Sequence, residues 1–98
     1  MSNTTQPRPL HVEKEQISAF KFPEGEVLKS DQEIKDRATN LDRALKLGNL
    51  EHNKIQIVFE DSEGLKEVET TVWGVTDKRV ILKQGIVMPI HRIHRVVA

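Results

Sequence analysis

Apolar and polar residues alternate in short runs over the carboxy-terminal half of the chain. Ile55, Ile57 and Phe59 alternate with their neighbours, and a period of two places successive side chains on opposite sides of a strand. Residues of turn type, such as the run from Asp61 to Gly64, separate this run from the next. The pattern predicts five strands, at 55–60, 65–76, 79–83, 86–88 and 94–97. Residues 90–93 fit either a single helical turn or the start of the last strand.

Five short strands joined by tight turns are typical of a small barrel, and this stretch is too short for two full sheets. Gly74 lies inside the second strand, where it predicts a bulge or sharp bend of the kind that barrel closure needs. Trp73, beside it, is interpreted as a core residue. The alternative is an exposed ring that stacks on a base or a peptide side chain.

One amphipathic helix precedes the strands. Ser30 and Glu33 match a capping box, and Gly48 is suited to a left-handed cap at the other end. The predicted apolar stripe faces the barrel or, alternatively, a partner; it consists of Ile34, Ala38, Leu41 and Leu45. The predicted solvent-exposed set consists of Lys35, Asp36, Arg37, Asp42, Arg43 and Lys46.

The first 29 residues are predicted to form an arm. Met1–Pro9 is polar and proline-containing, which favours disorder. The following stretch carries enough apolar residues, including Phe20 and Phe22, to pack on the barrel or on a partner, and the pattern does not decide between them. The expected fold is therefore mainly β with one helix: an arm (1–29) that is disordered in part or extended, then a domain (30–98) containing the α-helix and a five-stranded SH3-like or Sm-like small barrel.

Composition narrows the class of protein further. The chain has 98 residues and no cysteine, so disulfides and thiolate chemistry are excluded. No run approaches the length of a membrane span, and the first residues lack the pattern of a signal peptide. A single cytoplasmic domain without membrane contact is the expectation.

Few residues suggest catalysis or metal binding. His91 and His94 are three residues apart, but no further ligands stand near them in the sequence. No serine lies in a nucleophile-elbow context, and no glycine-rich phosphate loop is present. The chain is therefore expected to have no catalytic residues, no metal and no cofactor, and not to be an enzyme.

Charge is segregated, although the 15 basic and 15 acidic residues cancel. Six acids fall between Glu60 and Asp77, whereas no acid follows Asp77. The basic residues after that point predict contacts to phosphate, because arginine offers paired donors to oxyanions. The candidate nucleic-acid-binding residues are His91, Arg92, Arg95, Lys78 and Arg79. The alternative is a solvated rim whose charges pair across strands.

The order of elements resembles the Sm-like fold. The run from Val75 to Lys83 resembles the acidic turn and third strand of the bacterial Sm-like RNA chaperones of the Hfq type. The run from Ile90 to Val97 resembles their last strand, with His91 at the family's histidine and Ile90 where the family has lysine. The run Val68–Trp73 also resembles a stretch of short bacterial small-barrel proteins.

The resemblance implies a non-catalytic module that binds single-stranded RNA, assembled as a homo-oligomer. The rival hypothesis, motivated by zero net charge and the apolar arm, is a protein-interaction or adaptor module. It would dock a partner through the amino-terminal arm, the helix face or an edge strand.

Overall fold

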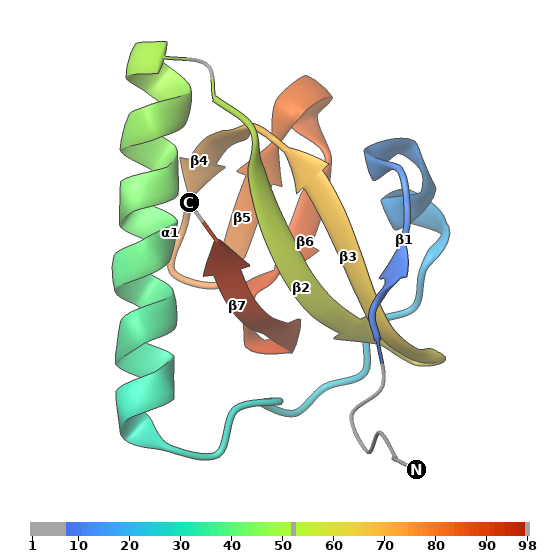
Figure 1. The fold of residues 1–98 in the computed structure, drawn as a ribbon. Helices are drawn as coiled ribbons and strands as arrows, with labels where there is room; N and C mark the ends of the chain where they lie inside the picture. Colours follow the sequence, from blue (N-terminus) through green and yellow to red (C-terminus); the bar gives the residue numbers. More distant parts are fainter. Residues whose placement is uncertain (1–7, 52, 98) are drawn as a thin grey trace, which may run out of the picture.

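The chain folds as one long helix packed beside two β-sheets. The computed structural model describes residues 8–51 and 53–97 (Figure 1). The helix is α1 (Asp31–Glu51). The first sheet has the order β1 (Leu10–His11), β3 (Gly64–Thr70), β2 (Ile55–Asp61), β7 (Ile93–Val97). The second has the order β4 (Val72–Val75), β5 (Arg79–Leu82), β6 (Val87–Pro89). Three 3₁₀ helices complete the fold: η1 (Lys14–Ala19), η2 (Lys83–Gly85) and η3 (Ile90–Arg92).

Helical and extended segments take up about equal shares of the chain, so the expected predominance of β structure is corrected. No strand pairing joins the two sheets within residues 8–51 and 53–97, which leaves two open sheets. The helical turn that the sequence left open at 90–93 is η3, directly before the last strand.

The long strand predicted at 65–76 is two strands. β3 pairs antiparallel with β2, with Ile55 opposite Thr70, and the chain then passes into the second sheet at Thr71. Residues either side of this break pack inward, since both Val68 and Val72 are buried. The bulge predicted at Gly74 is confirmed, because the register of β4 against β5 shifts between Val72 and Gly74.

The core lies between the sheets. Its largest fully buried side chains come from both sheets, from the arm and from α1: Phe59, Ile17, Leu41, Ile57, Leu82, Met88, Ile93, Val68, Val72 and Val80. The helix runs along one side of the sheets and packs against β4 and β7 (Figure 1). Burial of this apolar set is the main source of stability.

The helix begins as predicted and ends later. Ser30 Oγ accepts a hydrogen bond from the Glu33 N–H at 3.1 Å, and the Ser30 hydroxyl donates to the Glu33 carboxylate at 3.1 Å. The predicted cap at Gly48 is wrong, because α1 continues to Glu51. Gly48 is instead needed for close packing: a Cβ there would collide with the backbone oxygen of Val72.

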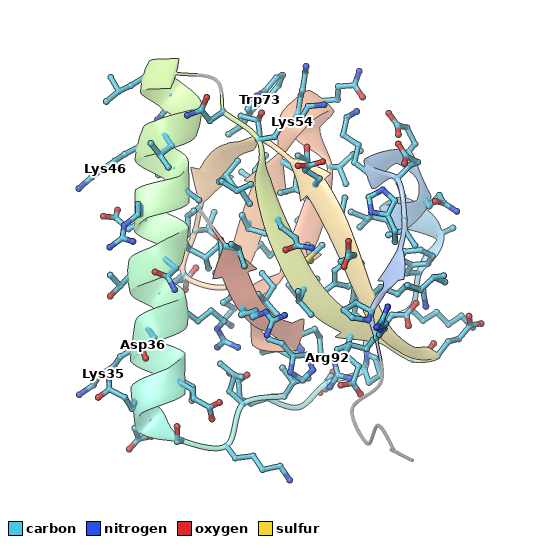
Figure 2. All side chains as sticks on the ribbon, in the orientation of Figure 1. Lys35, Asp36, Lys46, Lys54, Trp73 and Arg92 are labelled. Atoms are coloured by element: carbon cyan, nitrogen blue, oxygen red, sulfur yellow. The ribbon has the colours of Figure 1, made fainter. Side chains whose placement is uncertain are left out.

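The buried face of α1 is rotated from the predicted stripe. Leu41 and Ala44 are fully buried, whereas Ala38 is exposed. Arg37, predicted to be solvated, is only 5% exposed. Lys35 points away from the sheets (Figure 2). Asp36 is exposed as well.

The arm packs on the sheets of its own chain. β1 pairs parallel with β3, and Ile17 of η1 is 1% exposed within the core. The rings of Phe20 and Phe22 lie 6.2 Å and 6.0 Å from the Phe59 ring. Most of the segment predicted to be disordered, residues 1–7, lies outside the described residues.

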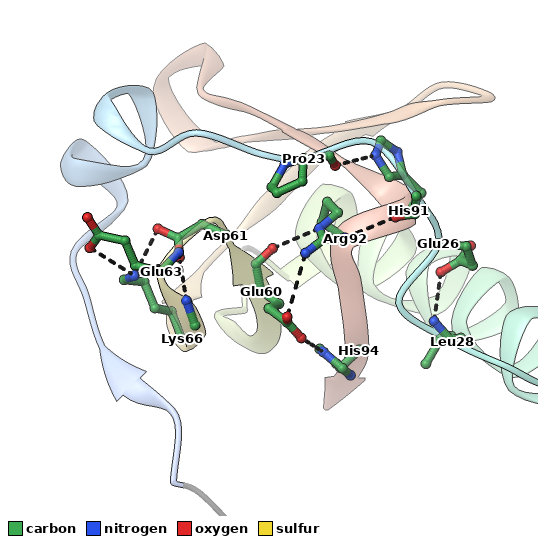
Figure 3. A network of polar contacts seen from close by, with 12 residues as sticks. Pro23, Glu26, Leu28, Glu60, Asp61, Glu63, Lys66, His91, Arg92 and His94 are labelled. Carbon is green, nitrogen blue, oxygen red and sulfur yellow. Dashed lines mark hydrogen bonds and ion pairs between the residues drawn. The ribbon is translucent and has the colours of Figure 1, made fainter.

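A buried ion pair lies under the arm. Lys66 Nζ donates to both carboxylate oxygens of Asp61 at 2.8 Å (Figure 3). The same Nζ lies 4.9 Å from the centre of the Phe20 ring. Burial raises the pKa of Asp61. Hydrogen bonds from the Lys66 ammonium and from the Glu63 and Gly64 amides lower the pKa by more than burial raises it, so the pKa lies below its usual value.

Trp73 is exposed, so its interpretation as a core residue is wrong. Its exposed fraction is 51%, and it lies near one end of the molecule (Figure 2). The bulge explains this, since the extra residue in β4 turns its side chain out of the inward-facing set. Among the residues that the structure describes, no helix combines the length and the apolar character needed to cross a membrane.

Candidate functional site

The structure brings together three of the five residues predicted to bind nucleic acid. Lys78, Arg79 and His91 line one cavity of about 370 Å³. Its other lining residues are Glu26, Arg37, Asp77, Pro89 and Ile90. The walls therefore come from the β4–β5 turn, η3, α1 and the segment that leads into α1.

The β4–β5 turn holds two of the cations in place. Thr76 Oγ1 accepts hydrogen bonds from the Arg79 N–H at 2.9 Å and the Lys78 N–H at 3.3 Å. The Thr76 N–H in turn donates to the Arg79 carbonyl at 2.8 Å. The backbone is thus fixed by a threonine in a turn, while both long side chains are exposed.

The third residue, His91, is on η3, which is tied to the same turn. The Ile90 N–H donates to the Lys78 carbonyl at 3.0 Å. On its other side, η3 holds the segment before α1: the Val27 N–H donates to the His91 carbonyl at 3.0 Å. The His91 ring reaches the Pro23 carbonyl, with Nε2 3.2 Å from the oxygen (Figure 3).

Arg92, which was predicted to hold a phosphate, lies beside the last strand as expected but is buried. It is 8% exposed, and its guanidinium donates to the carbonyls of Glu60 and Gly25, both at 3.1 Å (Figure 3). Its Nη2 also lies 3.7 Å from the Glu60 carboxylate, so its donors are committed to groups of the protein. Arg92 fastens the end of the arm to β2.

Arg95 is exposed but lies at another hollow, of about 180 Å³. That hollow is lined by Glu33, Asp36, Arg37, Asn40, His94 and Arg95. The neighbouring His94 ring contacts Glu60 Oε1 at 2.8 Å. This hollow has as many lining acids as the first cavity but fewer lining cations, which makes it a poorer place for a phosphate.

An ion pair closes the inner wall of the first cavity. Arg37 Nη1 and Nη2 each donate to a carboxylate oxygen of Glu26 at 2.6 Å, and Nη1 also donates to the Ile93 carbonyl at 2.9 Å. The hydrogen bond from Arg37 is the main reason that the pKa of Glu26 lies below its usual value, and burial opposes this shift.

An apolar groove continues from the cavity along α1. It has a volume of about 340 Å³ and shares Arg37, Asp77 and Ile90 with the cavity. Its remaining lining residues are Ile34, Ala38, Leu41, Val75 and Thr76. The predicted apolar stripe of α1 thus lines an open groove over part of its length.

Sequence reasoning missed Arg37 and Glu26. Arg37 lies one turn before Leu41, on the face of α1 that Ala44 and Gly48 continue. This helical spacing was the signal in the sequence that Arg37 would be buried. No local pattern marks Glu26 as its partner. Within residues 8–51 and 53–97, no cluster of three or more histidine or acidic side chains is arranged to hold a metal ion.

Comparison of the chain with protein-family models, with curated proteins and with solved structures finds no match.

Proposed function

We propose that the chain is a non-catalytic, cytoplasmic RNA-binding module with a small barrel of Sm-like type. One observation carries the proposal: the adjacent residues Lys78 and Arg79 meet His91, which is distant from them in the sequence, at a single cavity. Neither Lys78 nor Arg79 forms an ion pair with a described residue. Their charges are free to meet phosphate.

The order of elements supports the fold part of the proposal. A helix precedes the strands, the chain bends between β3 and β4, and a 3₁₀ turn precedes the last strand. β2 pairs on both sides, with β3 and β7, as a central strand of such a barrel would. The proposed barrel consists of β2, the continuous bent run of β3 and β4, β5, β6 and β7.

In this proposal the ligand is single-stranded. Arg79 and Lys78 hold neighbouring phosphates, and His91 contacts a base or phosphate from η3. Trp73 lies apart from the lining of the cavity, so stacking contributes little there. Phosphate contacts then dominate, and binding depends strongly on salt.

The test is fluorescence anisotropy of a short single-stranded RNA with wild type and the double variant Lys78→Ala, Arg79→Ala. We expect the salt dependence of the variant to be shallower by about 1.4 in log–log slope, at roughly 0.7 per lost phosphate contact on a single strand. Lys35→Ala with Arg43→Ala on the exposed face of α1 is the matched control. Equal loss in both double variants, or no binding by wild type at low salt, contradicts the proposal.

A homo-oligomer is part of the proposal. β6 and β7 each pair with one strand only, so each offers one edge without a strand partner among the described residues. Two different edges joined head to tail between copies generate a ring if the rotation closes. Sedimentation equilibrium that gives a monomer mass at micromolar concentration would remove this part.

The groove beside α1 favours a second candidate, a protein-interaction module. Ala38 is exposed at this groove and Ile34 is half-buried, so an apolar side chain of a partner protein would fit there. The arm is a weaker candidate, since Val12 and Ile17 belong to the core. If this second candidate is correct, Ala38→Glu should abolish partner capture and leave RNA binding unchanged. A variant that loses RNA binding but keeps partner capture favours the RNA-binding module.

A further inference from the structure

Arg37 is a buried cation that lines the cavity. Its side chain is 5% exposed, and it holds the Glu26 carboxylate through two parallel hydrogen bonds of 2.6 Å. Its Nε atom is buried and has no hydrogen-bond partner. A guanidinium in this arrangement presents the paired donors that recognise any oxyanion, carboxylate or phosphate alike.

The carboxylate that fills this position comes from a peripheral segment. Glu26 belongs to the segment 23–28, and its side chain is 31% exposed. Three hydrogen bonds fasten this segment to η3. The Pro23 carbonyl pairs with the His91 ring, and the Gly25 carbonyl accepts from the Arg92 guanidinium. The Val27 N–H donates to the His91 carbonyl. Gly25 has a φ of +114°, so the chain turns there in a conformation that glycine adopts readily.

Further cations stand around the same cavity. Lys78 and Arg79 lie on its other wall, with Asp77 as the one lining acid besides Glu26. With Glu26 in place, the cavity holds two carboxylates against these cations. Without the Glu26 charge, Arg37, Lys78 and Arg79 would face Asp77 alone.

We infer that this cavity contains a phosphate-binding site anchored by Arg37, and that the Glu26 carboxylate occupies it in the free chain. A phosphate that enters takes the paired donors of Arg37, while Lys78 and Arg79 neutralise its remaining charge. The identification of the phosphate as part of RNA rests on the proposed function. The site itself rests on the geometry of Arg37 and would equally serve a free phosphate.

The site is tested without RNA by thermal unfolding of Glu26→Gln in inorganic phosphate and in sodium chloride of equal ionic strength. Glutamine keeps one acceptor for Arg37 but removes the competing charge. We expect phosphate to raise the melting temperature of Glu26→Gln by several degrees more than that of wild type. Glu24→Gln is the control, because it lies on the same segment and changes the net charge equally. Equal phosphate shifts in all three proteins overturn the inference.

If Glu26→Gln is unfolded in both salts, the inference is tested by NMR on the wild-type chain. Phosphate should shift the NMR signals of the Arg37 side chain and the Glu26 amide, whereas chloride at the same ionic strength should not. Unchanged signals up to high phosphate concentration overturn the inference.

RNA then separates the site from the proposed function. If both are correct, Glu26→Gln binds a short single-stranded RNA several-fold more tightly than Glu24→Gln does. A phosphate-specific shift without RNA binding keeps the site, assigns it to a free phosphate or phosphomonoester, and removes the proposed function. RNA binding that is equal in the two variants, with no phosphate-specific shift, keeps the function and removes the Arg37 site.

Discussion

The two ends of the arm are held by different kinds of interaction. Upstream, Val12 and Ile17 are 4% and 1% exposed and lie in the core between the sheets. Downstream, the segment 23–28 is fastened by carbonyl groups and by the Glu26–Arg37 ion pair at the edge of a cavity. Both ends cover the same sheets, yet only the downstream end depends mainly on polar contacts.

The difference indicates which end can respond to a ligand. Apolar burial is not directional and no dissolved anion competes with it. A charge-assisted pair, in contrast, can be exchanged for another anion with the same donors. Under the proposed function, the upstream end serves stability and the downstream end serves binding.

The largest expected effect is on the buried Lys66–Asp61 pair, which joins β3 to β2 beneath the arm. Lys66→Ala leaves Asp61, which is 3% exposed, as an uncompensated buried charge. Breaking such a pair costs about 3–5 kcal/mol in the free energy of unfolding, measured by urea denaturation. Lys35→Ala on the exposed face of α1 is the control, with a change within about 0.5 kcal/mol. A cost for Lys66→Ala as small as the control's would show that the pair is not structural.

The next effect concerns the apolar contact of the arm. Ile17→Ala should lower the free energy of unfolding by about 2–4 kcal/mol, because it leaves a cavity in the core. RNA binding by the folded fraction should not change. Ser18→Ala, exposed on the same 3₁₀ helix, controls for local changes in η1. Weakened RNA binding at equal folded fraction would contradict the division between the two ends.

The smallest effect is a pH dependence at the downstream end. Folding lowers the pKa of Glu26, so the ion pair stabilises the fold above the ordinary pKa of about 4.5 and less as the pH falls below it. The stability difference between wild type and Glu26→Gln should therefore be constant near neutral pH and shrink below pH 4.5. Chemical denaturation between pH 3 and 7 measures it, and a difference that stays constant to pH 3 would exclude a charged pair.

Much of the fold was predictable because the responsible signals are local. The alternation at Ile55–Phe59, the turn at Asp61–Gly64 and the cap at Ser30 each depend on neighbouring residues, and each is present in the structure. The division of the predicted second strand at Thr71 was not predictable, since the strand pattern runs on unbroken through that residue.

The candidate site was predictable only in part, because it depends on long-range contacts. Lys78 and Arg79 stand out as a basic pair in a turn, and a turn keeps long side chains in solvent. Arg92 looks the same in the sequence, but the carbonyls that bury it belong to Gly25 and Glu60. The buried position of Arg37 was not predicted for the same reason, since its partner Glu26 lies in another segment.

The most direct test of the division between the two ends is an NMR titration of the wild-type chain with a short single-stranded RNA at low salt. The account predicts that amide signals change at residues 24–27, 77–79 and 90–91, while those at residues 10–19 stay in place. Changes concentrated at residues 10–19, or on the exposed face of α1, would contradict it.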